Sequence, residues 1–267
     1  MTRLSLNQAT TQRWSLREAV EGCARAGIPA IGIWRDKLAE LGLEQAVRLV
    51  RDAGLRVSSV CRGGMFPAAT AAERRVRIED NRRAVDEAAA LGADALVLVC
   101  GPAPGKDIAA AREMVREGIA ALLPYAEERG VRLGIEPLHP IFAGDRSVIV
   151  TLAEANALVE AFGSPELGIV ADVYHIWWDP DLYAQIERAA GRFVGFHVND
   201  WIVPLPDPLL GRGMIGDGLI ELRRIRAAVD AAGYAGPIEV EIFNRAIWDA
   251  PGDQVLAQIC KRYLAHV

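Results

Sequence analysis

Short apolar runs rich in Val, Ile and Leu recur along the chain, and a longer amphipathic run follows each of them. Short continuous apolar runs are typical of strands in a parallel sheet that is buried on both faces. We predict eight such strands, at residues 4–6, 30–34, 57–61, 95–100, 131–137, 167–173, 193–198 and 238–243.

The amphipathic runs between these strands predict eight helices, several with recognisable ends. Ser15 precedes the first of them, and Glu18 three residues later completes the pattern of a capping box. Gly27 ends that helix as a C-cap, and glycine ends four others in the same way. The predicted helices are residues 15–26, 44–53, 73–91, 108–129, 152–162, 182–190, 219–232 and 254–265, with the further stops at Gly54, Gly92, Gly130 and Gly233.

Eight strand–helix units in 267 residues predict one (β/α)8 TIM barrel, a single domain over residues 1–267. An open doubly wound sheet is the alternative, and it would need fewer strands. In a barrel the active site lies at the C-terminal ends of the strands. The residues that end each strand are therefore the candidates for chemistry.

The ends of the last four strands carry a set of metal-ligand residue types: Glu136, Asp172, His197 and Glu241. Three carboxylates and one imidazole suit a single divalent ion; we expect Mn²⁺, and Mg²⁺, Co²⁺ or Zn²⁺ would also fit. Three unpaired carboxylates in an apolar barrel mouth would otherwise carry a large desolvation penalty. The alternative is a network of ion pairs, because the chain is rich in arginine.

The alternation of side chains between the two faces of a strand, together with position along it, distinguishes the expected metal ligands from neighbouring polar residues. Glu239 and Glu241 share a face, and Glu241 lies nearer the C-terminal end of the strand, so we take Glu241 as the ligand and Glu239 as a polar group deeper in the barrel. His197 and Asn199 also share a face, and we assign Asn199 to substrate binding. Asp200 begins the following loop, where we expect it either to support the ligands or to anchor the loop.

Three short motifs carry a family resemblance: Asp172-x-x-His175, His197-x-x-Asp200 and Gly-Asp-Gly at residues 216–218. With them the whole chain resembles the sugar phosphate isomerase/epimerase superfamily, the xylose isomerase-like TIM barrels. The resemblance implies that the four strand-end residues bind one metal ion and that His175 contacts substrate hydroxyl groups. In the epimerases of this superfamily the two ligand glutamates act as base and acid on opposite faces of the substrate. Glu136 and Glu241 stand in those places.

Residues 136–140, 172–180 and 197–201 resemble a narrower group, the catalytic α-subunits of bacterial C-glycoside deglycosidases. That resemblance implies action on 3-keto-glycosides and a small β-rich partner subunit. Two features depart from the ketose 3-epimerase pattern. His139 follows the ligand Glu136 by three residues, and the loop 201–214 is long, apolar and contains three prolines.

The chemistry shared by these enzymes is removal of a proton from the carbon beside a carbonyl. A neutral imidazole, with a pKa near ~6.5, can act as base while the glutamates are held by the metal. Our lyase hypothesis therefore makes His139 the proton carrier, and the aglycone of a 3-keto-glycoside leaves by β-elimination. The alternative for His139 is a capped loop residue between prolines, and for His175 a hydrogen-bonding support of a ligand carboxylate.

Two other functions compete with the lyase. One is a keto-sugar or inosose isomerase or epimerase, and the other is a barrel that only binds a sugar or a protein partner. The complete ligand set argues against the binding protein. A nuclease-like relative of the same superfamily would have more histidine ligands and a basic surface, whereas this chain has four histidines and a net charge of −5.

Aromatic and basic side chains also gather at the expected rim. Trp34, Trp177 and Trp201 are assigned to substrate binding, with packing as the alternative for each single one; Trp178 and Trp248 lie at the same rim. Arg62 is assigned to substrate binding as well. For Arg62, Arg146 and Arg212 taken singly, a solvated surface position is the expected alternative.

Composition excludes several other classes of protein. The net charge of −5 argues against binding of nucleic acid, and no run of about 20 apolar residues predicts a membrane span. The N-terminus has no apolar signal-peptide core, so we expect a cytoplasmic protein with reduced cysteines. We also expect it to be an oligomer.

Only three lysines are present, which disfavours Schiff-base chemistry. A GxGxxG match at residues 211–216 lies about ten loop residues after a strand, outside the context of a dinucleotide site.

Overall fold

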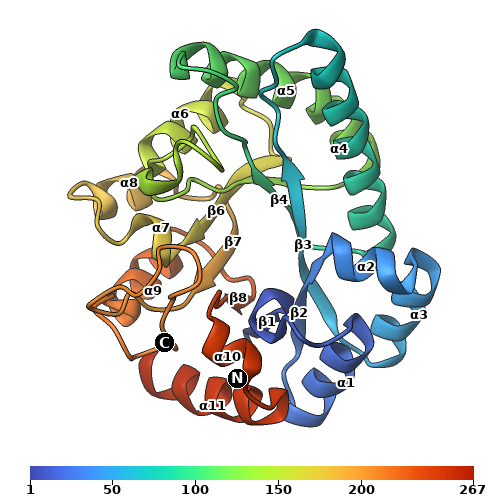
Figure 1. The fold of residues 1–267 in the computed structure, drawn as a ribbon, viewed down its shortest axis with the longest axis vertical. Helices are drawn as coiled ribbons and strands as arrows, with labels where there is room; N and C mark the ends of the chain where they lie inside the picture. The colour runs from blue at the N-terminus through green and yellow to red at the C-terminus, as the bar shows by residue number, and fades with distance from the viewer.

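Eight parallel strands form a closed barrel in the computed structural model, which describes residues 1–267 (Figure 1). Each strand pairs with the next along the chain, and the last pairs with the first, where Leu4 lies opposite Ile238. The strands are β1 (Leu4–Asn7), β2 (Ala30–Trp34), β3 (Arg56–Gly64), β4 (Leu96–Val99), β5 (Leu133–Ile135), β6 (Leu167–Asp172), β7 (Phe193–Val198) and β8 (Ile238–Val240). The prediction of a (β/α)8 barrel is confirmed, and the open sheet is excluded.

Helices surround the barrel, and both chain ends lie close to α11 on the same side of it (Figure 1). The eight predicted helices are all present. Three short helices that the pattern did not predict follow β2, β6 and β8 within a few residues, because these loops turn back sharply over the strand ends. The helices are α1 (Leu16–Ala26), α2 (Arg35–Leu41), α3 (Leu43–Asp52), α4 (Ala71–Leu91), α5 (Ile108–Arg129), α6 (Leu152–Phe162), α7 (Val173–Ile176), α8 (Leu182–Arg188), α9 (Leu222–Ala231), α10 (Arg245–Asp249) and α11 (Gly252–His266).

Helix ends follow the local capping chemistry closely. The Ser15 side chain accepts from the Glu18 amide, and the Glu18 carboxylate accepts from the Ser15 amide, so the predicted capping box is confirmed. Gly27 ends the helix at φ 67°, a left-handed conformation that glycine adopts without strain. A second capping box, from Thr70, starts α4 earlier than the apolar pattern alone indicates.

The hydrophobic core lies mainly between the strands and the surrounding helices, in one cluster of 61 buried residues. A smaller cluster that includes Val97, Val170 and Val194 packs separately from it. Gly134 is required there, because a Cβ at that position would lie 2.5 Å from the Val170 side chain. No helix is both long enough and apolar enough to pass through a bilayer.

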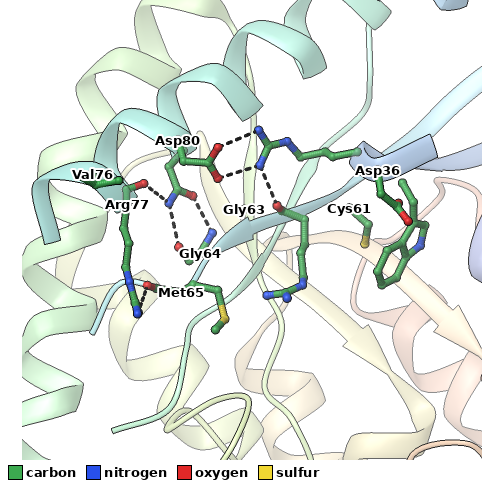
Figure 2. Close-up of a pocket in the computed structure, with 12 residues that line it drawn as sticks. Asp36, Cys61, Gly63, Gly64, Met65, Val76, Arg77 and Asp80 are labelled. Carbon is green, nitrogen blue, oxygen red and sulfur yellow. Dashed lines mark hydrogen bonds and ion pairs between the residues drawn. The ribbon is translucent and has the colours of Figure 1, made fainter. Parts of the chain in front are cut away.

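A pocket of about 420 Å³ opens beside the C-terminal ends of β2 and β3, under α4 (Figure 2). Trp34, Cys61 and Arg62 form its inner wall. Asn81 of α4 holds the end of β3 in place, since its side chain bonds both the amide and the carbonyl of Gly64. The strand ends on this side of the barrel are therefore rigidly positioned next to the open space.

Candidate metal centre and active site

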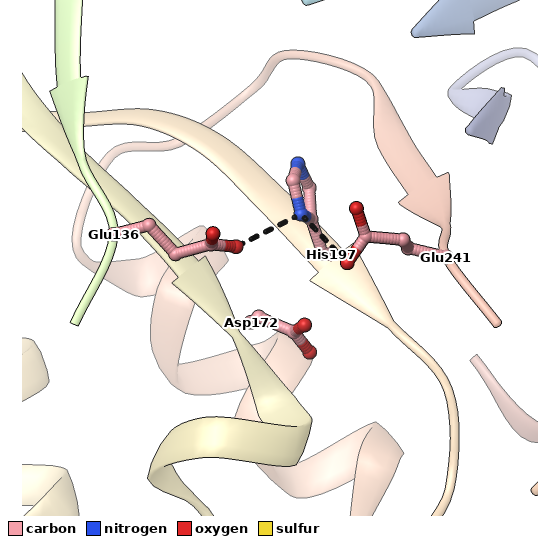
Figure 3. Close-up of side chains that lie close together, drawn as sticks. All are labelled: Glu136, Asp172, His197 and Glu241. Atoms are coloured by element: carbon pink, nitrogen blue, oxygen red, sulfur yellow. Dashed lines mark ion pairs between the residues drawn. The ribbon is translucent and has the colours of Figure 1, made fainter. Parts of the chain in front are cut away.

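The four predicted metal ligands converge at the C-terminal mouth of the barrel (Figure 3). Asp172 is the last residue of β6 and lies opposite His197 of β7, while Glu136 and Glu241 each directly follow their strands, β5 and β8. All four are buried, and one ligand atom from each lies within 4.8 Å of the others. Metal–ligand bonds of about 2.0–2.2 Å span up to about 4.4 Å between two ligand atoms, so a small inward movement would complete a site.

Several ligand atoms in this cluster lack any other bonding partner. Glu136 Oε1 and both ring nitrogens of His197 are buried and make no hydrogen bond. His197 Nδ1 lies 3.4 Å from Glu136 Oε1 and 3.8 Å from Glu241 Oε2 (Figure 3). Buried polar atoms without a partner are costly, and a cation between these atoms would satisfy them together. The residues present therefore fit a divalent metal.

Burial and charge shift the pKa values within the cluster. Burial opposes protonation of His197, but the carboxylates of Glu239, Glu136 and Glu241 raise its pKa to about 10. Burial raises the pKa of Glu241 to about 8, and the nearby Glu136 and Asp172 act in the same direction. Both shifts favour a bound proton, and a metal ion would take over that role.

Arg212 supplies one of the missing positive charges, and its position corrects an expectation. Its side chain is only 5% exposed, so the solvated surface position is wrong. Nη1 donates to Asp172 Oδ2 at 2.7 Å and to Glu241 Oε2 at 2.9 Å, and the guanidinium lies over the rings of Tyr174 and Phe243. The long loop after β7 folds back over the barrel mouth and brings it there. One guanidinium leaves Glu136 and His197 unpaired, so an arginine network alone does not satisfy the cluster.

The two histidines beside the ligands lie in different surroundings. His175 Nδ1 accepts from the His139 amide at 3.1 Å, and Nε2 lies 3.3 Å from Arg212 Nη2 and 3.7 Å from Asp172 Oδ2. Burial lowers the pKa of His175 to about 3 and keeps it neutral. The His139 ring instead stacks on Trp201, and its Nδ1 accepts from the Ile141 amide, as in the capped-loop alternative.

Three polar residues around the ligands hold the site together. Asn199 Nδ2 donates to Asp172 Oδ1 and to the Glu241 carbonyl, so it fixes two ligands. Glu239 lies deeper, 3.5 Å from His197 Nε2, and accepts from Asn7. The Asp200 carboxylate accepts only from amides of its own loop, at Trp201, Gly216 and Ile220, and thus anchors that loop.

The pocket at the ligands includes part of the predicted substrate-binding set. Trp34, Arg62 and His175 line it, whereas His139, Trp177, Trp201 and Asn199 do not. Trp201 packs against Trp177, Tyr174 and His139 in an aromatic layer beside the pocket. The sequence pattern did not indicate several lining residues, because they come from loops: Leu138, Phe142, Leu209 and Phe243.

Comparison with known families matches residues 20–263 to the model of the xylose isomerase-like TIM barrel. The chain belongs to the xylose isomerase-like TIM barrel family. The family-level resemblance predicted from the sequence motifs is thereby confirmed, whereas the narrower deglycosidase group stays a prediction.

The curated relatives that match this chain in sequence are enzymes. A 3-dehydroshikimate dehydratase of Pseudomonas putida is 28% identical over 257 residues, which is 90% of this chain and 38% of the relative. A D-psicose 3-epimerase of Agrobacterium fabrum is 27% identical over 128 residues, 48% of this chain and 40% of the relative. The chain thus spans less than half the length of these relatives. Dehydratase and epimerase relatives are consistent with a metal-dependent lyase, isomerase or epimerase.

Solved structures resemble this family member over nearly its whole length. Protein SMc04130 of Sinorhizobium meliloti 1021 superposes with a TM-score of 0.97 at 50% identity, covering 99% of this chain and 98% of its own. The IOLI protein, solved with a zinc atom, has a TM-score of 0.87 at 19% identity, over 99% and 98% of the two chains. At that identity the second likeness shows the shared fold alone.

Proposed function

We propose that this family member is a divalent-metal-dependent enzyme that removes a proton from the carbon beside the carbonyl of a keto-sugar or related cyclic ketone. The observation that carries this proposal is the buried cluster of three carboxylates and one imidazole at the barrel mouth, with unpaired ligand atoms facing one another. Glu136, Asp172, His197 and Glu241 would hold the metal, and Mn²⁺ is the ion we expect.

A bound divalent ion would polarise the substrate carbonyl and stabilise negative charge that develops on its oxygen. The protein's own groups position the substrate. His175 and the Arg212 guanidinium both line the pocket, where they could bind substrate oxygens. Asn199 keeps Asp172 oriented, and the apolar Phe243 and Leu209 limit water around the reacting carbon.

Glu136 is the base that the geometry favours. Its carboxylate lies on the pocket wall, so that one oxygen could bind the metal while the other receives the substrate proton. His139, the base in our sequence hypothesis, would need to turn away from Trp201 to reach the same space. We therefore propose Glu136 for proton removal and keep His139 as the alternative that an experiment must separate.

For the outcome of the reaction we propose β-elimination, so that a group at the β position leaves and a lyase results. The dehydratase match supports this choice, because it extends over 90% of the chain and the two epimerase matches over 48% and 62%. The most specific form of the proposal is cleavage of a 3-keto-glycoside, with the aglycone beside Trp34 and the pocket at β2 and β3. A small β-rich subunit and an oligomeric assembly belong to this form.

Epimerisation is the second candidate, and one observation favours it. Glu136 and Glu241 approach His197 from opposite sides (Figure 3), and the shorter His197 contact is to Glu136. Two carboxylates on opposite sides of a bound ketose could remove a proton from one face and return one to the other.

Proton exchange in D₂O tests the proposal directly. The Mn²⁺-loaded protein is incubated with D-allulose, 3-dehydroshikimate and a phenyl 3-keto-glucoside, and loss of the signal from the C–H beside the carbonyl is followed by NMR. We expect exchange with at least one ketone, together with elimination of water or phenol. Exchange with none of them would refute the proposal.

Two variants test the assignment of the base in the same assay. His139→Gln should retain exchange, because His139 lies outside the pocket, and a loss of about a hundredfold or more would return the role to His139. Glu136→Gln should lower exchange by at least about a hundredfold, through loss of the base and of a metal ligand together. Glu113→Gln, on the surface of α5, is the matched control and should behave as wild type.

A further inference from the structure

Two arginines line the ligand pocket without a partner for their charge. Arg62 is partly buried at the end of β3, and no hydrogen bond or ion pair reaches its guanidinium. Arg146 lines the same pocket with its side chain 35% exposed; its Nε is buried without a hydrogen bond, the nearest carboxylate, Asp145, is 3.9 Å away, and the guanidinium lies 5.9 Å from the centre of the Phe142 ring. Neither Arg62 nor Arg146 has a carboxylate within hydrogen-bond distance, although both face a pocket.

Neighbouring arginines show the contrast. Arg35 is bonded to Asp80 and Glu87, and Arg77 donates to backbone carbonyls at Met65 and Pro67 (Figure 2). Arg212 is bonded to two ligand carboxylates. These guanidinium groups are already occupied, whereas Arg62 is not. Burial and the nearby Arg146 also lower the pKa of Arg62, which is the electrostatic effect expected of unpaired like charges.

Charge balance at the pocket leads to the same conclusion. A divalent ion and Arg212 together would match the three carboxylates of Glu136, Asp172 and Glu241, and Glu239 deeper in the barrel adds a fourth carboxylate. Arg62 and Arg146 then bring two positive charges against this one, so one positive charge remains in excess at the pocket wall. A neutral ketose would leave it uncompensated.

We propose that Arg62 and Arg146 bind a carboxylate carried by the substrate, so that the substrate is the anion of a keto-polyol acid. This inference rests on the proposed function, because it places the carboxylate in the same pocket as the reacting carbonyl. Guanidinium groups form paired hydrogen bonds with planar carboxylates, which gives both affinity and orientation. The carboxylate would fix which carbon of the substrate faces Glu136.

The surroundings limit where the carboxylate can lie. Beyond Arg62, in the pocket at β2 and β3, Asp80 is paired with Arg35, and Arg77 donates to a backbone carbonyl (Figure 2). Arg62 is therefore the arginine of that pocket wall that is open to a carboxylate. The loop after β8, residues 244–248, is not rich in glycine, so it lacks the cup of backbone amides with which barrels commonly hold a phosphate.

Ligand pairs that differ only in charge test the inference. Isothermal titration measures binding of 3-dehydroshikimate and of its methyl ester, each with metal-free and with Mn²⁺-loaded protein. We expect the acid to bind at least about tenfold more tightly than the ester in both states, as charge-assisted hydrogen bonds would produce. Arg62→Gln and Arg146→Gln should each reduce this ratio by about tenfold and leave binding of the ester unchanged.

Controls separate the arginine charge from a general effect. Arg62→Lys should keep part of the preference, and Arg116→Gln, on the outer surface of α5, should keep all of it. Melting curves confirm that the variants are folded. Equal binding of acid and ester, no binding of either, or an unchanged ratio in both glutamine variants would overturn the inference. So would stronger competition by D-fructose 6-phosphate than by the acid, which would identify a phosphate site instead.

Failure of the carboxylate site can be distinguished from failure of the proposed function. Proton exchange on D-allulose without a preference for the acid would refute the carboxylate site and leave the enzyme assignment in place. Preferred binding of the acid without proton exchange on any ketone would have the reverse meaning.

Discussion

Removal of the Arg212 charge should destabilise the metal-free protein strongly and the metal-loaded protein much less. Arg212 pairs with Asp172 and Glu241 where all three side chains are nearly inaccessible. Loss of one partner from a buried ion pair costs about 3–5 kcal/mol, because the remaining charges lie uncompensated. For 267 residues about 1 kcal/mol corresponds to roughly 2 °C in melting temperature, so Arg212→Met should melt about 6–10 °C lower.

Thermal unfolding followed by circular dichroism measures this difference, once in EDTA and once with saturating Mn²⁺. In Mn²⁺ the ion would compensate the same carboxylates, so we expect the difference between variant and wild type to fall below half of its value in EDTA. Methionine is chosen because an unbranched apolar side chain can retain contact with the Tyr174 and Phe243 rings while it removes the charge.

Two controls accompany this measurement. Arg262 forms an ion pair with Asp217, but the two side chains are 31% and 40% exposed, so Arg262→Met should cost under about 1 kcal/mol in either buffer. Arg212→Lys should recover part of the loss in EDTA. If Arg212→Met lowered the melting temperature equally with and without Mn²⁺, the charge argument would be refuted and Arg212 would act by packing.

Three further predictions concern the same cluster. Glu136→Gln should lose the Mn²⁺-induced rise of about 5 °C in melting temperature that is expected at a hundredfold excess over Kd, and a retained rise would contradict a ligand role. Glu239→Gln should weaken Mn²⁺ binding about 10–100-fold by titration calorimetry, because Glu239 lies beside His197 Nε2, and an unchanged Kd would be the contrary result. His175 has a folded pKa of about 3, below its unfolded value near ~6.5, so its contribution is complete above pH ~6.5 and is lost as pH falls toward 3. Between pH 6 and 4 in EDTA the stability of wild type should therefore decline more steeply than that of His175→Gln, by roughly 1 kcal/mol per pH unit, whereas parallel declines would exclude this assignment.

Sequence pattern predicted the regular elements well because local rules govern them. The bounds of β2, β7, α5 and α6 agree with prediction, and the helix stops at glycines such as Gly27 adopt the expected left-handed conformation. The short helices α2, α7 and α10 escaped prediction. Each begins within a few residues of a strand end, where a polar or aromatic segment has too few residues to display a helical period.

The candidate metal centre was predictable for a related reason. Parallel strands of one barrel all end at the same mouth, so acidic and imidazole side chains at successive strand ends must meet. Glu239 and Glu241 share a face, and position along the strand separated them: Glu241 joins the cluster at the mouth and Glu239 lies deeper. Residues on long loops carry no such constraint. Arg212 is fifteen positions beyond His197, and only the folded loop shows that it reaches Asp172.

The sequence by itself determined the barrel, the ends of most helices and the identity of four converging ligand side chains, because periodicity and capping act over a few residues. Tertiary structure alone decided which loop residues enter the pocket. It placed His139 against Trp201 and outside the pocket, Arg212 inside it, and Arg62 and Arg146 on its wall without partners. The physical reason is that contacts between distant loops depend on packing and charge compensation across the whole barrel mouth, which no local pattern encodes.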